Sequence, residues 1–248
     1  MINNSIYYSP TKVYFGEDQE NNIGKIIDEY GYKNILIVYG KNSVVKSGLL
    51  EKITKQLNVS YHLRGGVEPN PKISFVLETN EKFKDVNIDL ILAIGGGSVI
   101  DTAKAISATK LENINPLDIL QRKVEPTKFI DVATVLTLSA AGSELSSSCV
   151  LSDLELKIKR GFNNNKIRPV FSILNPKLTY TVSKYQTANG IVDIMMHTLE
   201  RFFNPKYTIQ FTSEVAIGIL KTVVDNGMIA INNPCDYEAR ANLMLAGS

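Results

Sequence analysis

The feature that most constrains the fold is a short apolar run that ends in three glycines and leads directly into a helical pattern. Residues 90–94 read Leu-Ile-Leu-Ala-Ile, the composition of a buried strand, and Gly95, Gly96 and Gly97 follow. A helical pattern begins at Ser98 or Val99. Glycines let a backbone approach a phosphate closely, and a helix N-terminus offers free N–H groups. The segment therefore predicts a dinucleotide site in a doubly wound sheet.

The glycine run on its own leaves two interpretations open. It matches neither the G-x-G-x-x-G fingerprint nor the phosphate-binding G-x-x-x-x-G-K-[ST] loop. A run of glycines between a strand and a helix is also a common way to make a tight turn without a ligand. Phosphate binding and a plain turn therefore both have to be tested against the rest of the chain.

Composition excludes several classes of protein. The 248 residues suffice for one large or two smaller domains, and a net charge of +2 without a Lys/Arg block argues against nucleic-acid binding. The apolar runs are all shorter than a transmembrane helix, and the first residues lack signal-peptide order, so we expect no membrane contact. Cys149 and Cys235 form no C-x-x-C motif, which favours a reducing, cytoplasmic location.

The first half of the chain alternates between strand and helix patterns, and further short strand patterns follow it. An apolar β-branched run at 35–39 predicts a central parallel strand, and a rigid loop with two prolines follows at 68–71. This alternation predicts right-handed crossovers and ligands at the carboxyl ends of the strands. The expected strands are 35–39, 59–63, 88–94 and 129–134, with short pieces near 149–151 and 170–174, and the expected helices are 44–57, 73–83 and one from 98 or 99.

Helical periodicity dominates after about Val182. Ser183, with Gln186 three residues later, has the pattern of a capping box, and helices are expected over 190–203, 212–224 and from 237 to the end. We therefore predict an N-terminal Rossmann-like α/β domain with a parallel sheet over residues 1–181. The start of an all-helical domain is predicted over residues 182–248.

Asp193 and His197 stand four residues apart in the first of these helices. That spacing places both side chains on one helix face, where a carboxylate and an imidazole can chelate one divalent metal. The commoner explanation of such a pair is a hydrogen bond on an amphipathic helix. His62, the other histidine, falls in an expected strand and is interpreted as a structural or surface residue.

Five motifs occur together in a characteristic order. They are Glu68-Pro69-Asn70-Pro71, the 95–101 turn (Gly-Gly-Gly-Ser-Val-Ile-Asp), 137–144 (Thr-Leu-Ser-Ala-Ala-Gly-Ser-Glu), 173–181 (Ile-Leu-Asn-Pro-Lys-Leu-Thr-Tyr-Thr), and Asp193-x-x-x-His197-x-x-Glu200. Their order and spacing resemble the iron-containing (group III) alcohol dehydrogenases, most closely the butanol dehydrogenase-like branch.

The resemblance implies NAD(P)-dependent interconversion of small alcohols and aldehydes at one divalent metal, Fe²⁺ or Zn²⁺, in a cleft between the two domains. It implies Asp193 and His197 as metal ligands, with no catalytic residue beyond them. The cofactor-binding residues that it implies are Asn70, Gly96, Gly97, Ser98, Asp101, Thr137, Leu138, Lys159, Leu178 and Tyr180.

The choice between NADP and NAD depends on the residues directly after the strand at 35–39. Enzymes that select NAD usually place an acidic side chain there, against the adenosine ribose. Here the strand runs into Gly40, Lys41 and Ser43 with no Asp or Glu. We assign these three residues to the cofactor site and favour NADP, because a lysine can bind a 2′-phosphate.

The chain also departs from the family pattern. The resemblance implies two further histidine ligands C-terminal to His197, and the sequence stops at Ser248 before segments that would carry them. We therefore expect a shortened family member with weak metal affinity and little dehydrogenase activity by itself. An incomplete helical domain predicts exposed apolar side chains and self-association as a homo-oligomer, and the residues concerned are Val215, Ile217, Ile219, Leu220 and Val223.

Two alternatives stay open at this point. One is a related enzyme of the same scaffold, such as a glycerol dehydrogenase or dehydroquinate synthase, which shares the Gly-Gly-Gly-Ser-x-x-Asp turn. The other is a catalytically inactive nucleotide-binding remnant or interaction module. Cofactor binding without turnover would favour the second alternative.

Overall fold

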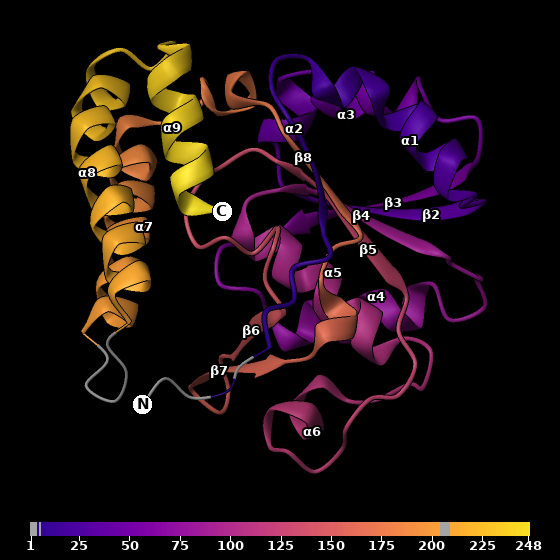
Figure 1. Ribbon diagram of the computed structural model, residues 1–248. Coiled ribbons are helices and arrows are strands. Elements are labelled where there is room, and N and C mark those ends of the chain that lie inside the picture. The colour runs from indigo at the N-terminus through magenta and orange to yellow at the C-terminus, as the bar shows by residue number, and fades with distance from the viewer. Residues whose placement is uncertain (1–3, 5, 204–208) are drawn as a thin grey trace.

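Six parallel strands form the central sheet of the protein (Figure 1). The computed structural model describes residue 4 and residues 6–203 and 209–248. The strands lie in the order β1-β8-β5-β4-β2-β3, with parallel pairing throughout. Their bounds are β1 Lys12–Phe15, β2 Asn34–Gly40, β3 Ser60–Val67, β4 Leu90–Gly95, β5 Asp131–Leu136 and β8 Phe171–Leu174.

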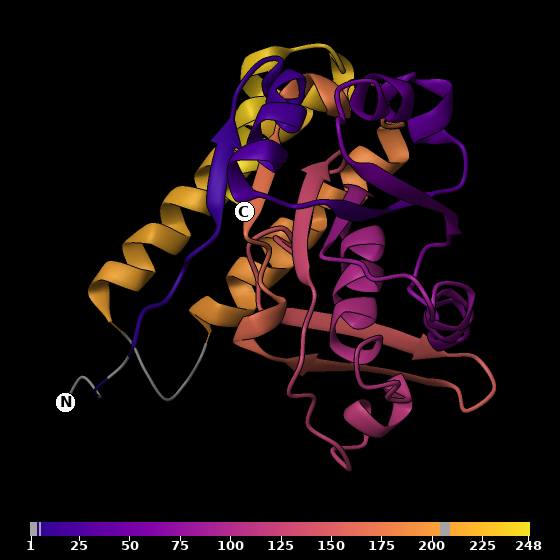
Figure 2. The same ribbon diagram turned by 90° about the vertical axis from the view of Figure 1, so that its right-hand side faces the viewer.

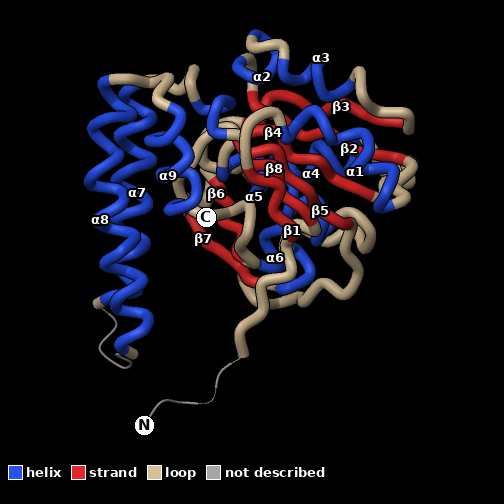
Figure 3. Tube along the Cα trace, turned by 45° about the horizontal axis from the view of Figure 1, so that its top comes forward, coloured by secondary structure: helices blue, strands red, loops and turns tan. Residues whose placement is uncertain are grey.

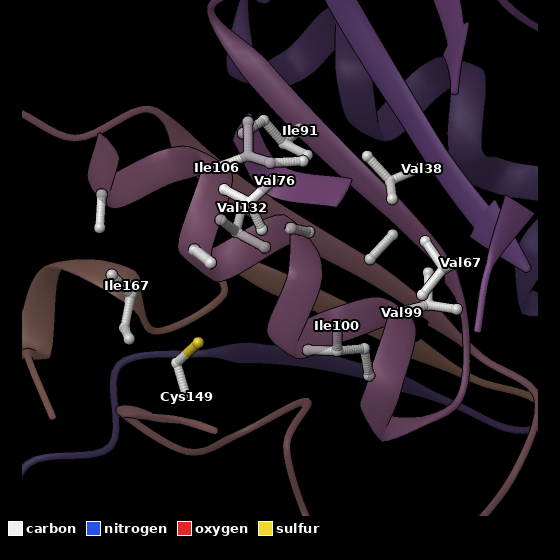
Figure 4. Packing of buried hydrophobic residues seen from close by; sticks show 14 of the residues in the cluster. Val38, Val67, Val76, Ile91, Val99, Ile100, Ile106, Val132, Cys149 and Ile167 are labelled. Atoms are coloured by element: carbon white, nitrogen blue, oxygen red, sulfur yellow. The ribbon is translucent and has the colours of Figure 1, made fainter. Parts of the chain in front are cut away.

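Both faces of this sheet are buried, which explains the continuous apolar runs in its strands. Alternate side chains point to opposite faces, so Leu36 and Val38 join one core while Ile35 and Ile37 join the other. The first core is closed by α4 (Ile73–Lys82), α5 (Gly97–Thr109) and α6 (Pro116–Leu120), and Figure 4 shows its packing around Ile100 and Ile106. The second is closed by α1 (Ile23–Tyr30), α2 (Ser43–Lys46) and α3 (Leu49–Thr54).

The strand order confirms the predicted doubly wound α/β fold. From β2 the chain moves outward to β3, returns to the other side of β2 as β4, and continues to β5 and β8. The direction of winding therefore reverses between β2 and β4. In such sheets a ligand binds at the carboxyl ends of the two strands that flank the reversal.

Several local predictions were wrong or incomplete. The expected helix at 44–57 is two helices, α2 and α3, because Gly48 adopts a left-handed backbone conformation with φ of +75° between them. The strand at 59–63 extends to Val67 as β3. A hairpin of β6 (Ser148–Asp153) and β7 (Ile158–Asn163) lies beside α5 and outside the main sheet (Figure 2). The sequence patterns also missed β1, α1 and α6.

Three helices follow the sheet and stand beside it (Figure 3). They are α7 (Lys184–Phe202), α8 (Gln210–Asn232) and α9 (Tyr237–Gly247). The hydroxyl of Ser183 accepts a hydrogen bond from the Gln186 amide at 3.2 Å, which confirms the N-cap and starts α7 at Lys184 rather than at 190. Within the described residues, no helix has the length and apolar character needed to cross a membrane.

The helices dock on the loop that comes after β5. A Cβ added to Gly190 of α7 would lie 2.5 Å from the Ser139 carbonyl oxygen, so only glycine allows this approach. The guanidinium of Arg240 in α9 donates to the Thr187 hydroxyl of α7 at 3.0 Å. The contact between α7 and the loop after β5 is therefore tight, and α7 is tied to α9 by a polar contact.

The exposed apolar side chains predicted on α8 are only partly confirmed. Val215 and Ile217 are about half exposed. Ile219 and Leu220 are half-buried, and Val223 is fully buried against α7 and α9, which contradicts the expectation for that residue. Phe211, Val224 and Met228 of α8 are also exposed.

Candidate nucleotide cleft and metal-ligand pair

A cleft of about 530 Å³ opens where the winding of the sheet reverses. Its walls come from the carboxyl ends of β2 and β4, the loop after β5, the residues around α2 and α3, and the start of α7. Cavities of this size are typical of small-molecule and cofactor sites. The residues that line it are Glu20, Gly40, Ser43, Val44, Ser47, Gly48, Leu49, Lys52, Gly95, Gly96, Val99, Thr137, Leu138, Lys177, Leu178, Thr181, Val182, Ser183 and Gln186.

The turn from β4 into α5 is glycine because other atoms come very close to it. A Cβ on Gly95 would lie 2.5 Å from Val99 Cγ2, and one on Gly96 would lie 3.1 Å from Leu138 Cβ. The absence of side chains lets α5 begin directly at the sheet edge. The first amide groups of a helix have no acceptor within the helix, so the start of α5 offers N–H donors and a positive dipole end to an anion in the cleft.

The far side of the cleft holds a buried acid that the sequence patterns did not identify. The Glu20 carboxylate is almost fully buried and accepts from Lys52 Nζ at 2.7 Å and from Asn175 Nδ2 at 2.8 Å. Lys52 therefore reaches the cleft as a cation whose position is fixed by Glu20. Neither residue lies in a recognisable motif, because their meeting depends on how η1 (Gln19–Asn22) packs on α3 and β8.

The structure brings only some of the predicted cofactor residues to this cleft. Those that line it are Gly40, Ser43, Gly96, Thr137, Leu138 and Leu178. Gly97 and Ser98 form the first turn of α5 beside it. Those outside its lining are Lys41, Asn70, Asp101, Lys159 and Tyr180.

Asp101 is engaged by protein groups rather than turned to the cleft. Its carboxylate accepts from the Ser143 hydroxyl at 2.9 Å and the Val150 amide at 3.0 Å. Lys104, one turn later in α5, donates to the carbonyl oxygens of Ser143, Ser146 and Ser148 at 2.6–2.9 Å. Burial raises the pKa of Asp101 and lowers that of Lys104. Together the two residues fasten the loop after β5, so Asp101 acts on the cleft wall through that loop.

The loop at 68–71 carries a second polar group beside the end of β2. Asn70 has a left-handed backbone conformation, with φ of +58°, and its Oδ1 accepts from Lys159 Nζ at 3.0 Å. Glu68 accepts from Lys41 Nζ at 2.5 Å and also from the Lys72 ammonium. These hydrogen bonds to Lys41 and Lys72 lower the pKa of Glu68 to about 2. Lys41 is thus a paired cation.

Asp193 and His197 lie on one face of α7, as the spacing predicts. His197 Nε2 is 3.6 Å from Asp193 Oδ1, and both side chains are slightly under half exposed. At 100° per residue, Gln186, Gly190, Asp193 and His197 fall within one narrow stripe of the helix. Gln186 lines the cleft and Gly190 touches the loop after β5, so the stripe that carries the pair faces the sheet domain.

This pair is a candidate for part of a metal site. A carboxylate oxygen and an imidazole nitrogen one helical turn apart have the chemistry that divalent transition metals prefer. Among the described residues, no group of three or more His, Cys, Asp or Glu side chains converges to complete it. The ring of His62 lies 5.7 Å from that of Phe83, in keeping with a structural role.

With this geometry established, comparison with known proteins shows that the chain belongs to the iron-containing alcohol dehydrogenase family, whose model matches residues 10–176. The chain is 42% identical over 245 residues to NADH-dependent butanol dehydrogenase A of Clostridium acetobutylicum, covering 98% of this chain and 63% of that protein. It is 35% identical over 251 residues to the NADPH-dependent aldehyde reductase YqhD of Escherichia coli, covering 100% of this chain and 64% of that protein.

Solved structures agree with the fold. The crystal structure of NADH-dependent butanol dehydrogenase A from Thermotoga maritima superimposes with a TM-score of 0.95 at 33% identity, covering 98% of this chain and 62% of that one. The chain thus spans slightly less than two thirds of the length of these relatives. The resemblance stated from the five motifs is confirmed.

Proposed function

We propose that the protein is an NAD(P)-dependent, divalent-metal-dependent alcohol/aldehyde oxidoreductase of the butanol dehydrogenase type. The observation that carries this proposal is the cleft at the reversal between β2 and β4, with the glycine turn on one wall and the stripe of Gln186, Asp193 and His197 beside it. The activities for which the relatives are named, butanol dehydrogenase and aldehyde reductase, support the substrate class of small alcohols and aldehydes.

The residues of this chain would bind and orient the dinucleotide. Gly96 lets the pyrophosphate approach the backbone, and the amides at the start of α5, from Gly97 and Ser98, face its charge. Thr137, Leu138 and Leu178 line the cleft walls on either side. Asp101 and Lys104 hold the loop that carries Thr137 and Leu138 in place. The cofactor itself supplies the hydride chemistry.

The metal would be held at Asp193 and His197. A divalent cation, Fe²⁺ or Zn²⁺, supplies Lewis-acid chemistry at the alcohol oxygen when bound. The two side chains are close enough to share one ion after small rotations, since Nε2 and Oδ1 are 3.6 Å apart. Two donors give a weak site, so turnover by this chain is expected to be low.

The cleft by itself would also support a second function. A nucleotide-binding module without turnover would need the cleft and not the metal. The glycerol dehydrogenase or dehydroquinate synthase alternative has no observation in its favour, because the similar proteins that we compare are butanol dehydrogenases and an aldehyde reductase.

Turnover and binding measured together test the proposal. The purified chain is titrated with NADH and NADPH, and then mixed with Fe²⁺ or Zn²⁺ and butyraldehyde while cofactor oxidation is followed. We expect saturable dinucleotide binding and slow, metal-dependent oxidation that His197→Ala abolishes and His62→Ala leaves unchanged. Binding without any turnover would favour the module, and absence of binding would refute both functions.

We also propose a cytoplasmic, self-associating protein. The free thiols of Cys149 and Cys235 suit a reducing compartment. Phe211, Val224 and Met228 of α8 expose more than half of their surface, and exposed apolar side chains promote association. Light scattering should give a mass that rises with protein concentration, and a constant monomer mass would contradict this expectation.

A further inference from the structure

Helix α7 carries a row of exposed apolar side chains. Its members are Tyr185, Val192, Met196 and Phe203, with exposed fractions of 72%, 56%, 58% and 70%. At 100° per residue, all four fall within about 20° of one line along the helix. Thr187 of α7 accepts the hydrogen bond from Arg240 of α9, and the row lies about 140–180° round the helix from Thr187. The row is therefore on the side of α7 that faces away from α9.

Helix α8 carries a second row of the same kind. Its members are Ile217, Val224 and Met228, with exposed fractions of 50%, 60% and 62%. Asn226 of α8 accepts a hydrogen bond from Asn242 of α9 at 3.3 Å, and the second row lies about 160–180° round α8 from Asn226. Because α7 and α8 pack side by side, both rows lie on the side of the pair opposite α9 (Figure 3). We call these seven side chains the outer face.

The α7 row has the same pattern in both directions along the helix. Val192 and Met196 lie two residues before and after Ile194. Tyr185 and Phe203 lie nine residues before and after the same position. Two α7 helices packed antiparallel about a two-fold axis level with Ile194 therefore bring aromatic ring against aromatic ring and valine against methionine. Aromatic and methionine side chains are enriched in interface cores, so this self-matching row fits a second copy of the chain.

The polar side chains beside the row also match in this arrangement. A two-fold axis keeps the same flank of α7 on the same side in both copies. Asn189 and Glu200 are on one flank, five residues before and six residues after Ile194, so the amide of one copy comes opposite the carboxylate of the other. Near the axis on this flank, the two Asp193 carboxylates lie between the two His197 imidazoles. Donor–acceptor matches of this kind fix the orientation of an interface.

We propose that the outer face binds a second copy of this chain, with the two α7 helices antiparallel about a two-fold axis and Val192 of each copy against Met196 of the other. The inference rests on the proposed function in one respect, because it specifies the surface through which the proposed self-association occurs. It does not depend on dinucleotide binding. The second copy shields the exposed side of the Asp193–His197 pair from solvent.

Opposite charges at the two paired positions test this packing. Met196→Glu and Val192→Lys each place a charge against an apolar side chain, so each variant alone is expected to be monomeric. Mixed in equal amounts, they should form a heterodimer, because the introduced lysine of one chain then faces the introduced glutamate of the other. Both positions are more than half exposed, so the fold tolerates the charges. The control is Leu154→Glu, which charges an exposed leucine between β6 and β7, outside the outer face.

Sedimentation velocity on the full chain and the three variants gives the dissociation constant of the dimer, and circular dichroism checks that each variant is folded. The wild type and Leu154→Glu are expected to dimerise with constants that agree within about twofold. For Met196→Glu or Val192→Lys alone, the constant is expected to rise at least about hundredfold, the effect of an unpaired charge in an apolar interface. The equimolar mixture should return to within about tenfold of the wild type.

The opposite results separate the packing from self-association and from the oxidoreductase proposal. If the wild type stays monomeric, this inference and the proposed self-association both fail, and NADH titration of the same samples decides the oxidoreductase proposal independently. If the wild type associates and the charged variants do so equally well, another surface is responsible and only this inference fails. If each charged variant is monomeric and their mixture is monomeric too, the antiparallel pairing of Val192 with Met196 is wrong.

Discussion

The sheet domain and the three C-terminal helices bury their apolar side chains to very different degrees. Every residue of β4 is buried, and both faces of the sheet are covered by helices. The 23 residues of α8 contribute only four buried positions, all small or β-branched, while Phe211 and Met228 are 74% and 62% exposed. One region has closed cores on both sides of its sheet, and the other has a narrow core and an open apolar face.

The two regions therefore have different roles, because one contributes most of the stability and the other carries the candidate metal ligands. Hydrophobic burial is the main favourable term in folding, so the sheet domain carries most of the stability of the chain. The cofactor cleft is lined mainly by that domain, whereas Asp193 and His197 stand on the weakly buried helices. We therefore expect nucleotide binding to be robust and the metal-ligand pair to depend on how α7 is held against the loop after β5.

The largest effect is expected from Lys104→Met, which removes the buried cation of the sheet domain. Three carbonyl oxygens of the 143–148 loop lose their donor, and Asp101 loses the Lys104 charge that favours its ionised form. Breaking such a buried arrangement costs about 3–5 kcal/mol. Urea denaturation followed by circular dichroism measures this loss. The control is Lys25→Met, which breaks a largely exposed ion pair with Glu29 and should change the free energy of unfolding by less than about 0.5 kcal/mol. If Lys104→Met and Lys25→Met lowered the free energy of unfolding equally, the structural role of Lys104 would be contradicted.

Two matched truncations compare the cores directly. Ile91→Ala in β4 creates a cavity in a closed core and is expected to cost about 2–5 kcal/mol. Ile194→Ala in α7 is expected to cost less than half as much, because the smaller core around it can collapse. Hydrogen exchange should accelerate throughout the chain in the first variant and only in α7, α8 and α9 in the second. The same pattern in both would show that the two regions unfold as one unit.

A pair of glycines tests the joint between the regions. Gly190→Ala forces a Cβ to within 2.5 Å of the Ser139 carbonyl oxygen, and the resulting shift of α7 is expected to cost about 1–3 kcal/mol. Gly218→Ala in α8 meets no atom within 4 Å and should stabilise the protein by about 0.5–1 kcal/mol through helix propensity. Thermal unfolding measures both, and a stabilised Gly190→Ala would mean that the joint is loose.

The smallest effect concerns the pH dependence of the same joint. Glu144 accepts from the Ser248 hydroxyl at 2.7 Å, and burial raises its pKa above the ordinary value of 4.5. The folded state therefore keeps a proton that the unfolded state has released, and stability falls as pH rises from about 4.5 through the folded pKa. Glu144→Gln should remove this loss, so its advantage over wild type should grow from pH 4 to pH 8. An advantage that shrinks with rising pH would contradict the assignment.

Patterns with a strong physical cause were predictable from the sequence. The strands at 35–39 and 90–94 are continuous apolar runs because both of their faces are buried, and Ser183 caps α7 as its spacing indicates. The break at Gly48 was missed because the apolar positions on either side of it keep a helical period. Strand β1 was missed because its four residues are too few to show a strand pattern in the sequence.

The parts of the site that were missed depend on contacts between distant segments. Glu20 meets Lys52 and Asn175 only after η1, α3 and β8 have packed together. Glu68 reaches the end of β2 only because β2 and β3 pair in this register. A search along the chain for an acid after β2 cannot find a carboxylate that arrives from the neighbouring strand.

The most direct test of the central claim measures where a metal at Asp193 and His197 lies relative to the bound dinucleotide. Mn²⁺ is added to the complex with NADH, and the paramagnetic relaxation of the cofactor protons is recorded by NMR. We predict faster relaxation of the nicotinamide H4 proton than of the adenine protons, and loss of this difference in His197→Ala. Faster relaxation of the adenine protons, or no effect of Mn²⁺ that depends on His197, would contradict the account.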